Sequence, residues 1–202
     1  MGYGKQLAAE DLQGNDFAPR LTKPYLGPAK LLSGGLDTVG KEGEWTVIKF
    51  IFQLLDPEFK GVQHESAIFE PQDEDDRVEK MQRRVAYILK YFVGEEMALN
   101  AVNAATSFEN LAANVSEALR RAEDSWKTKE VQVKVLGSVY NGKARLDFPA
   151  YLGFIGDENS AAALSWGRRE ISDNAAYLAS LETPATTASE MGGSPTSAPN
   201  TF

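Results

Sequence analysis

The chain has 202 residues, of which 29 are acidic and 21 basic, with a formal net charge of −8 and no cysteine. This length suits one domain with a sizeable core, and a hydrophobic fraction of 43% excludes a wholly disordered chain. The lack of cysteine excludes disulfides, thiol nucleophiles and cysteine-bound zinc. No apolar run reaches the roughly 20 residues that span a bilayer, so we expect a cytoplasmic protein without membrane contact.

The two ends of the chain differ in composition from its middle. Residues 1–23 lack periodicity and are predicted to form a flexible leader. Residues 183–202 are mainly Pro, Thr, Ser, Ala and Gly, a composition that buries too little apolar surface to offset the entropy of ordering. We therefore expect a folded domain at 24–156, a weak helical extension at 157–182 and a disordered tail at 183–202.

Three strands are predicted in the first part of the domain. Residues 44–55 carry β-branched or aromatic side chains at nearly every position and end before Pro57. Residues 26–32 and 61–70 are predicted as its neighbours, with a Gly-rich loop at 33–43 between the first two strands. The two-residue period of a strand places one apolar set on the core face, namely Ile48, Phe50, Phe52 and Leu54.

A helical block is predicted at 73–126, because apolar residues recur there at intervals of three and four. Gly94 ends its first helix, and Ser107 caps the helix that begins at Phe108. The apolar face of the first helix consists of Val78, Met81, Val85, Ile88, Leu89 and Phe92.

The two-residue period returns at Glu130 and continues to a hairpin turn at Asn141-Gly142, a pair typical of type I′ turns. The partner strand is predicted at 144–154, where Pro149 indicates a sheet edge or a bulge because it donates no backbone hydrogen bond.

The order of the elements is strand, strand, strand, helices, strand, strand. This order predicts an α+β protein with a mainly β core: a five-stranded, OB-like Greek-key barrel with a helical insertion between strands 3 and 4. A generic α+β sandwich with a helical layer is the alternative, whereas an alternating α/β sheet does not fit the order.

An OB-fold binds oligonucleotides or oligosaccharides on its second and third strands, between two flanking loops, here at 33–43 and 140–143. Aromatic rings stack on bases, and Lys or Arg side chains follow the phosphates without reading sequence. The candidate nucleic-acid-binding residues are Trp45, Lys49, Lys41, Lys134, Tyr140, Lys143, Arg145 and Tyr151. In the alternative interpretation, Trp45, Tyr140 and Tyr151 cover a second apolar layer against the helices.

The negative charge is unevenly distributed along the chain. Residues 70–125 carry 7 cations and 12 anions, whereas residues 126–151 carry 5 cations and 2 anions. The final hairpin is therefore basic on an otherwise acidic protein, and the net charge alone does not argue against a nucleic-acid partner.

The chain resembles the single-stranded DNA-binding and recombination-accessory proteins of tailed bacteriophages. The resemblance covers residues 24–156 and is carried by the strand EWTVIKFIFQLLDPE, the hairpin KEVQVKVLGSVYNGKARLDFPAYLGF and the helical insert between them. It implies a non-catalytic protein that coats single-stranded DNA in replication or recombination. It also implies docking of replication or recombination proteins at Phe202, although this tail has a single acidic residue, Glu190, unlike the acidic tails of the family.

Two other functions compete with DNA binding. A viral structural or assembly protein would form homo-oligomers through the helical block and both termini. A carboxylate-dependent nuclease would use Glu70, Asp73 and Asp75, but such a run before a helix is explained by the helix dipole. With one histidine and no nucleophile–base pair, we expect no enzyme activity, no metal and no cofactor.

Overall fold

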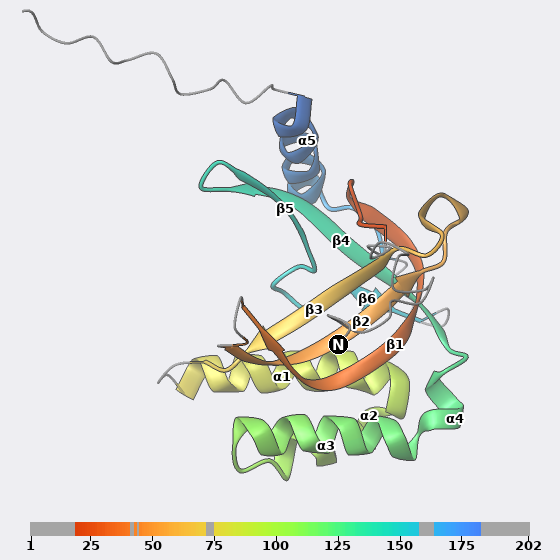
Figure 1. Cartoon of the computed structure of the whole chain (residues 1–202), viewed down its shortest axis with the longest axis vertical. Helices are drawn as coiled ribbons and strands as arrows, with labels where there is room; N and C mark the ends of the chain where they lie inside the picture. The colour runs from red at the N-terminus through yellow and green to blue at the C-terminus, as the bar shows by residue number, and fades with distance from the viewer. Residues whose placement is uncertain (1–18, 41–42, 44, 72–74, 158–163, 183–202) are drawn as a thin grey trace, which may run out of the picture.

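The computed structural model describes residues 19–40, 43, 45–71, 75–157 and 164–182. In Figure 1 the sheet lies above the helices of residues 75–126, and the helix of residues 168–182 stands on the other side of the sheet. The elements are β1 (Tyr25–Val39), β2 (Trp45–Leu54), a 3-10 turn (Pro57–Phe59), β3 (Gln63–Phe69), α1 (Asp75–Val93), α2 (Glu95–Asn103), α3 (Phe108–Arg121), α4 (Glu123–Trp126), β4 (Glu130–Tyr140), β5 (Lys143–Asp147), β6 (Ile155–Gly156) and α5 (Arg168–Glu182).

The strands pair in the order β3-β2-β1-β4-β5, with β6 attached to β4, and every pair is antiparallel. Strands β1, β2 and β3 follow one another, and β4 returns beside β1 after a long connection, which is a Greek-key order. That connection contains α1 to α4, so the predicted α+β class and the helical insertion between the third and fourth strands are both found.

The sheet does not close into the predicted barrel. Strands β3 and β5 end the pairing order, and no ladder joins them in the described chain. Strand β5 has only 5 residues, not the predicted run to Phe154, because Pro149 follows it closely and cannot donate to a ladder. Side chains meet at this seam instead: the Phe148 ring lies 5.0 Å from the His64 ring of β3 and 5.1 Å from the Phe52 ring of β2.

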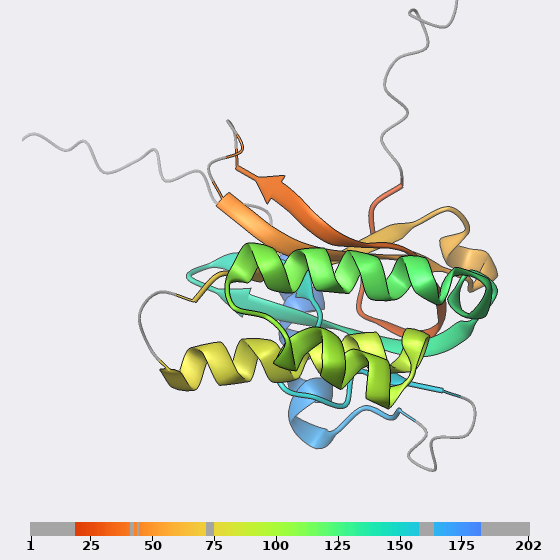
Figure 2. The ribbon, with the colours of Figure 1, turned by 90° about the horizontal axis from the view of Figure 1, so that it is seen from below.

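The core lies between the sheet and the helical insert (Figure 2). The predicted core face of β2 is confirmed, since its four apolar side chains are at most 1% exposed. Helix α1 contributes four of its predicted apolar residues as buried side chains, with Met81 partly buried. Ser107 caps α3 by accepting a hydrogen bond from the Asn110 amide, as expected. None of the described helices combines the length and apolarity needed to cross a membrane.

Strand β1 is longer than predicted and continues through most of the expected loop to Val39. A register shift between Leu31 and Ser33 marks a β-bulge, after which the strand pairs with β2 alone. Gly34 and Gly35 belong to this strand because α3 packs directly on it. A Cβ at Gly34 would lie 2.7 Å from Leu119 of α3, so the glycines permit close packing here.

The seam between β3 and β5 predicts a pH-dependent stability. His64 has a buried Nε2 with no hydrogen-bond partner among the described residues, and burial lowers the pKa of this imidazole despite the nearby carboxylates of Asp147 and Glu65. Below the ordinary histidine pKa of about 6.5, the unfolded chain binds a proton at this residue that the folded protein does not bind. The free energy of unfolding therefore decreases as the pH decreases. We expect His64→Phe to flatten the decline in urea-unfolding free energy between about pH 6.5 and 5. An unchanged decline in this variant would show that other groups cause it.

Candidate nucleic-acid interface

The β4–β5 hairpin carries cations and an aromatic ring on one face. Ser138 lies opposite Arg145, and Tyr140 lies opposite Lys143, so their side chains point to the same side of the hairpin. The Arg145 guanidinium lies 5.6 Å from the centre of the Tyr140 ring. Tyr140 is 61% exposed. Lys143 and Arg145 form no ion pair with any described residue, so both positive charges remain available to a ligand.

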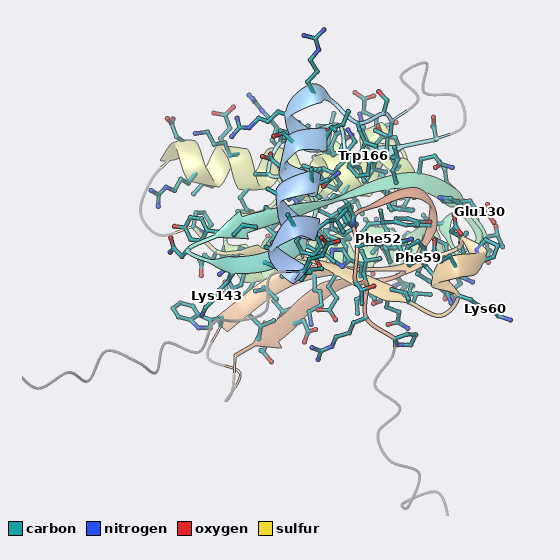
Figure 3. The ribbon with its side chains drawn as sticks, turned by 90° about the horizontal axis from the view of Figure 1, so that it is seen from above. Phe52, Phe59, Lys60, Glu130, Lys143 and Trp166 are labelled. Atoms are coloured by element: carbon teal, nitrogen blue, oxygen red, sulfur yellow. The ribbon has the colours of Figure 1, made fainter. Side chains whose placement is uncertain are left out.

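This face continues toward α5 into an open hollow of about 600 Å³. Leu136 lies in its wall, two residues before Ser138, together with Tyr151 and Arg169. Arg169 has an almost fully exposed side chain, 3.8 Å from Asp173. We call the surface formed by Leu136, Tyr140, Lys143, Arg145, Tyr151 and Arg169 the hairpin strip. Figure 3 shows Lys143 at the outer end of this hairpin, away from Phe52 and Phe59 of the core.

Helix α1 fixes the segment that carries Tyr151. The Arg84 guanidinium donates a hydrogen bond to the Pro149 carbonyl and lies 4.6 Å from the centre of the Phe154 ring. The Tyr87 hydroxyl donates to the Ile155 carbonyl at 2.7 Å. Burial lowers the pKa of Arg84, as expected for a guanidinium held between a carbonyl and a ring. The helical insert therefore positions the aromatic ring beside the hollow.

A second exposed aromatic cluster lies on the outer face of β2 and β3. Trp45 is 55% exposed at the start of β2, and Phe69, opposite Val47, is 52% exposed on the same face. The two hairpins, β1–β2 and β4–β5, extend toward the same side of the molecule in Figures 1 and 2. Tyr151 is 48% exposed, so the three predicted aromatic residues are not covered by the described helices.

Lys49 lies on the same face as Trp45 but is already ion-paired. Its Nζ lies 2.6 Å from a carboxylate oxygen of Asp37 and 3.3 Å from one of Glu65. The hydrogen bond with Asp37 raises the pKa of Lys49 and lowers that of Asp37. Since two carboxylates surround one ammonium group, this face offers no net positive charge to a phosphate, and Lys49 is left out of the hairpin strip.

Lys134 is buried, although its alternation with the valines of β4 predicts an exposed side chain that could bind nucleic acid. It is 5% exposed, and its Nζ lies 3.0 Å from both carboxylate oxygens of Glu170 in α5. The same Nζ donates to the Ser165 carbonyl at 2.7 Å, and Glu170 accepts from the Gly167 amide. The structure thus gives Lys134 the role of holding α5 to the sheet, where helix packing buries its charge.

Three predicted site residues lie outside the described residues: Lys41, Phe202 and, for the nuclease hypothesis, Asp73. Within the described part of the chain, no three His, Asp or Glu side chains are grouped so that they could hold a metal ion.

Two exposed residues near these surfaces, Phe69 and Arg169, are not among the predicted site residues. Phe69 belonged to a predicted strand, but its exposure depends on its position at the sheet edge beside Trp45. Arg169 lies in the predicted helical extension at 157–182, and its place in the hollow depends on how α5 packs against β4. The one available signal was the Arg168-Arg169 pair in an otherwise acidic C-terminal region. Comparisons with family models, with curated proteins and with solved structures found no significant match.

Proposed function

We propose that this protein binds single-stranded DNA without sequence preference and without catalysis, along the hairpin strip. The observation that carries the proposal is the group formed by Tyr140, Lys143 and Arg145: an exposed ring and two cations without an ion pair among the described residues, all on one hairpin face. Sequence-tolerant binding to single strands needs these two elements, a surface for base stacking and cations for the phosphates. The strip from Leu136 to Tyr140 is about 14 Å long, with the hollow beyond it, which suits a few nucleotides.

The pairing order of the sheet supports an OB-like interpretation of this site. A Greek-key meander followed by a final hairpin is the arrangement in which OB-folds present two loops beside a binding surface. We infer a partly open barrel of this type, with its open seam filled by Phe148. In this arrangement Trp45 at the β1–β2 hairpin provides a second stacking surface for a strand that extends beyond the hairpin strip.

The distribution of charge supports binding at this surface rather than at the exposed arginines of the helical insert. On α1 and α3, exposed arginines are paired with glutamates, as in Arg83 with Glu79 and Arg120 with Glu117. The acidic helical block repels phosphates, whereas the hairpin has an excess of cations. A coating role in phage replication or recombination follows from the resemblance to phage single-stranded DNA-binding proteins.

Oligo-dT binding tests the proposal directly. We expect fluorescence anisotropy of labelled oligo-dT to show binding at low salt, with an affinity that falls linearly on a logarithmic scale as salt rises. Duplex DNA of the same length should bind more weakly, because its bases are not available for stacking. Lack of salt-sensitive binding to oligo-dT at low ionic strength would refute the proposed function.

A further inference from the structure

Helix α5 presents an exposed apolar stripe that no described element covers. Ile171, Leu178 and Leu181 are 56%, 43% and 54% exposed, and Ala175 between them is also exposed. The opposite side of the helix holds the buried Glu170 and Tyr177 against the sheet. Figure 1 places α5 beside β4, away from α1, α2 and α3, so these helices do not cover the stripe.

The stripe has the spacing of a short coiled-coil seam. With Ile171 at heptad position a, Leu178 falls at the next a and Leu181 at the following d. The intervening d position is Asn174, whose side chain accepts a hydrogen bond from the Gly137 amide of β4. The neighbouring e positions are Arg168, Ala175 and Glu182, all exposed.

The charges at the two ends of α5 oppose those that stabilise an isolated helix. Cations favour the C-terminus of a helix and anions its N-terminus, yet Arg168 begins α5 and Glu182 ends it. Neither side chain has an ion pair with another described residue. In two copies of α5 packed antiparallel, e positions face each other across the seam. Arg168 of each copy would then lie opposite Glu182 of the other. The two Ala175 residues would lie opposite each other at the centre.

We propose that α5 pairs antiparallel with α5 of a second copy of this chain, forming a two-fold symmetric dimer. The occupant of the stripe is identified by its self-complementarity: Ile171 of each copy meets Leu181 of the other, Leu178 meets Asn174, and both ends form Arg–Glu pairs. A helix of 15 residues is about 22 Å long, so the contact is small and the dimer depends on protein concentration. Because α5 also borders the hollow, the dimer carries two hairpin strips next to a shared interface.

Sedimentation of the full chain over a wide concentration range, without nucleic acid, tests this proposal. We expect the wild type to shift from monomer to dimer, and Ile171→Glu with Leu178→Glu to remain monomeric at every concentration. Leu99→Glu, on the exposed side of α2, is the matched control and should dimerise like the wild type. Circular dichroism verifies that each variant is folded.

A charge exchange tests the antiparallel register. Arg168→Glu alone and Glu182→Arg alone each place like charges together twice in the dimer, and each should weaken it by roughly tenfold. The double variant Arg168→Glu with Glu182→Arg restores both pairs and should recover most of the affinity. A wild type that is monomeric throughout, or a double variant weaker than both single variants, would overturn the proposal. Oligo-dT binding by the stripe variants is measured separately, so the proposed function and the dimer can fail independently.

Discussion

Replacement of both Lys143 and Arg145 by Glu is expected to lower the affinity for oligo-dT more than tenfold at low salt. Both cations are exposed on the hairpin strip, and no carboxylate of the described residues pairs with them, so their replacement removes phosphate contacts and adds repulsion. Each phosphate contact with a single strand contributes about 0.7 to the slope of log affinity against log salt, so the slope should fall by about 1.4. Anisotropy titrations at four salt concentrations measure both quantities.

The matched control changes the charge equally on a different surface. Lys80 and Arg83 are exposed on α1, and replacing both by Glu alters the net charge by the same amount. If binding follows the local arrangement of the strip, this control should retain the wild-type salt slope and lose little affinity. Equal losses in the two double variants would mean that only the net charge matters, and the hairpin strip would be rejected as the site.

The elements of the fold were largely predictable because each depends on a local pattern. Alternation in 44–55 identified β2 and its core face, and spacings of three and four identified α1. The end of β1 was not predictable in this way, because Gly34 and Gly35 resemble a loop unless the packing of α3 is known. The open seam likewise depends on Phe148 filling the space where a β3–β5 ladder was expected.

The candidate site also contains residues whose role follows from the local sequence and residues whose role depends on tertiary contacts. Tyr140, Lys143 and Arg145 lie next to a two-residue turn, so their common face follows from the hairpin register alone. Lys49 and Lys134 occupy strand positions that alternation places outside the core, yet tertiary partners neutralise both. Alternation assigns a side to each residue, but it does not show which carboxylate or helix lies on that side. The charge available to a ligand is therefore a property of the folded protein.

The buried pair of Lys134 and Glu170 gives the largest expected effect on stability. Glu170→Gln keeps an acceptor for the Gly167 amide but leaves the Lys134 ammonium buried without a counter-charge. Removal of one partner from a buried ion pair costs about 3 kcal/mol or more, because the remaining charge is uncompensated. We expect urea unfolding to show a loss of this size, with little change in the slope of the transition.

Lys134→Met added to Glu170→Gln should recover most of that stability, since the buried charge is then absent and the methionine fills similar space. The same double variant separates a structural role from a binding role. A lysine that only holds α5 to the sheet can be removed without loss of ligand contacts, so oligo-dT affinity should stay within about twofold of the wild type. If the double variant is folded but binds oligo-dT as poorly as the Lys143→Glu, Arg145→Glu protein, Lys134 must contribute to the nucleic-acid interface.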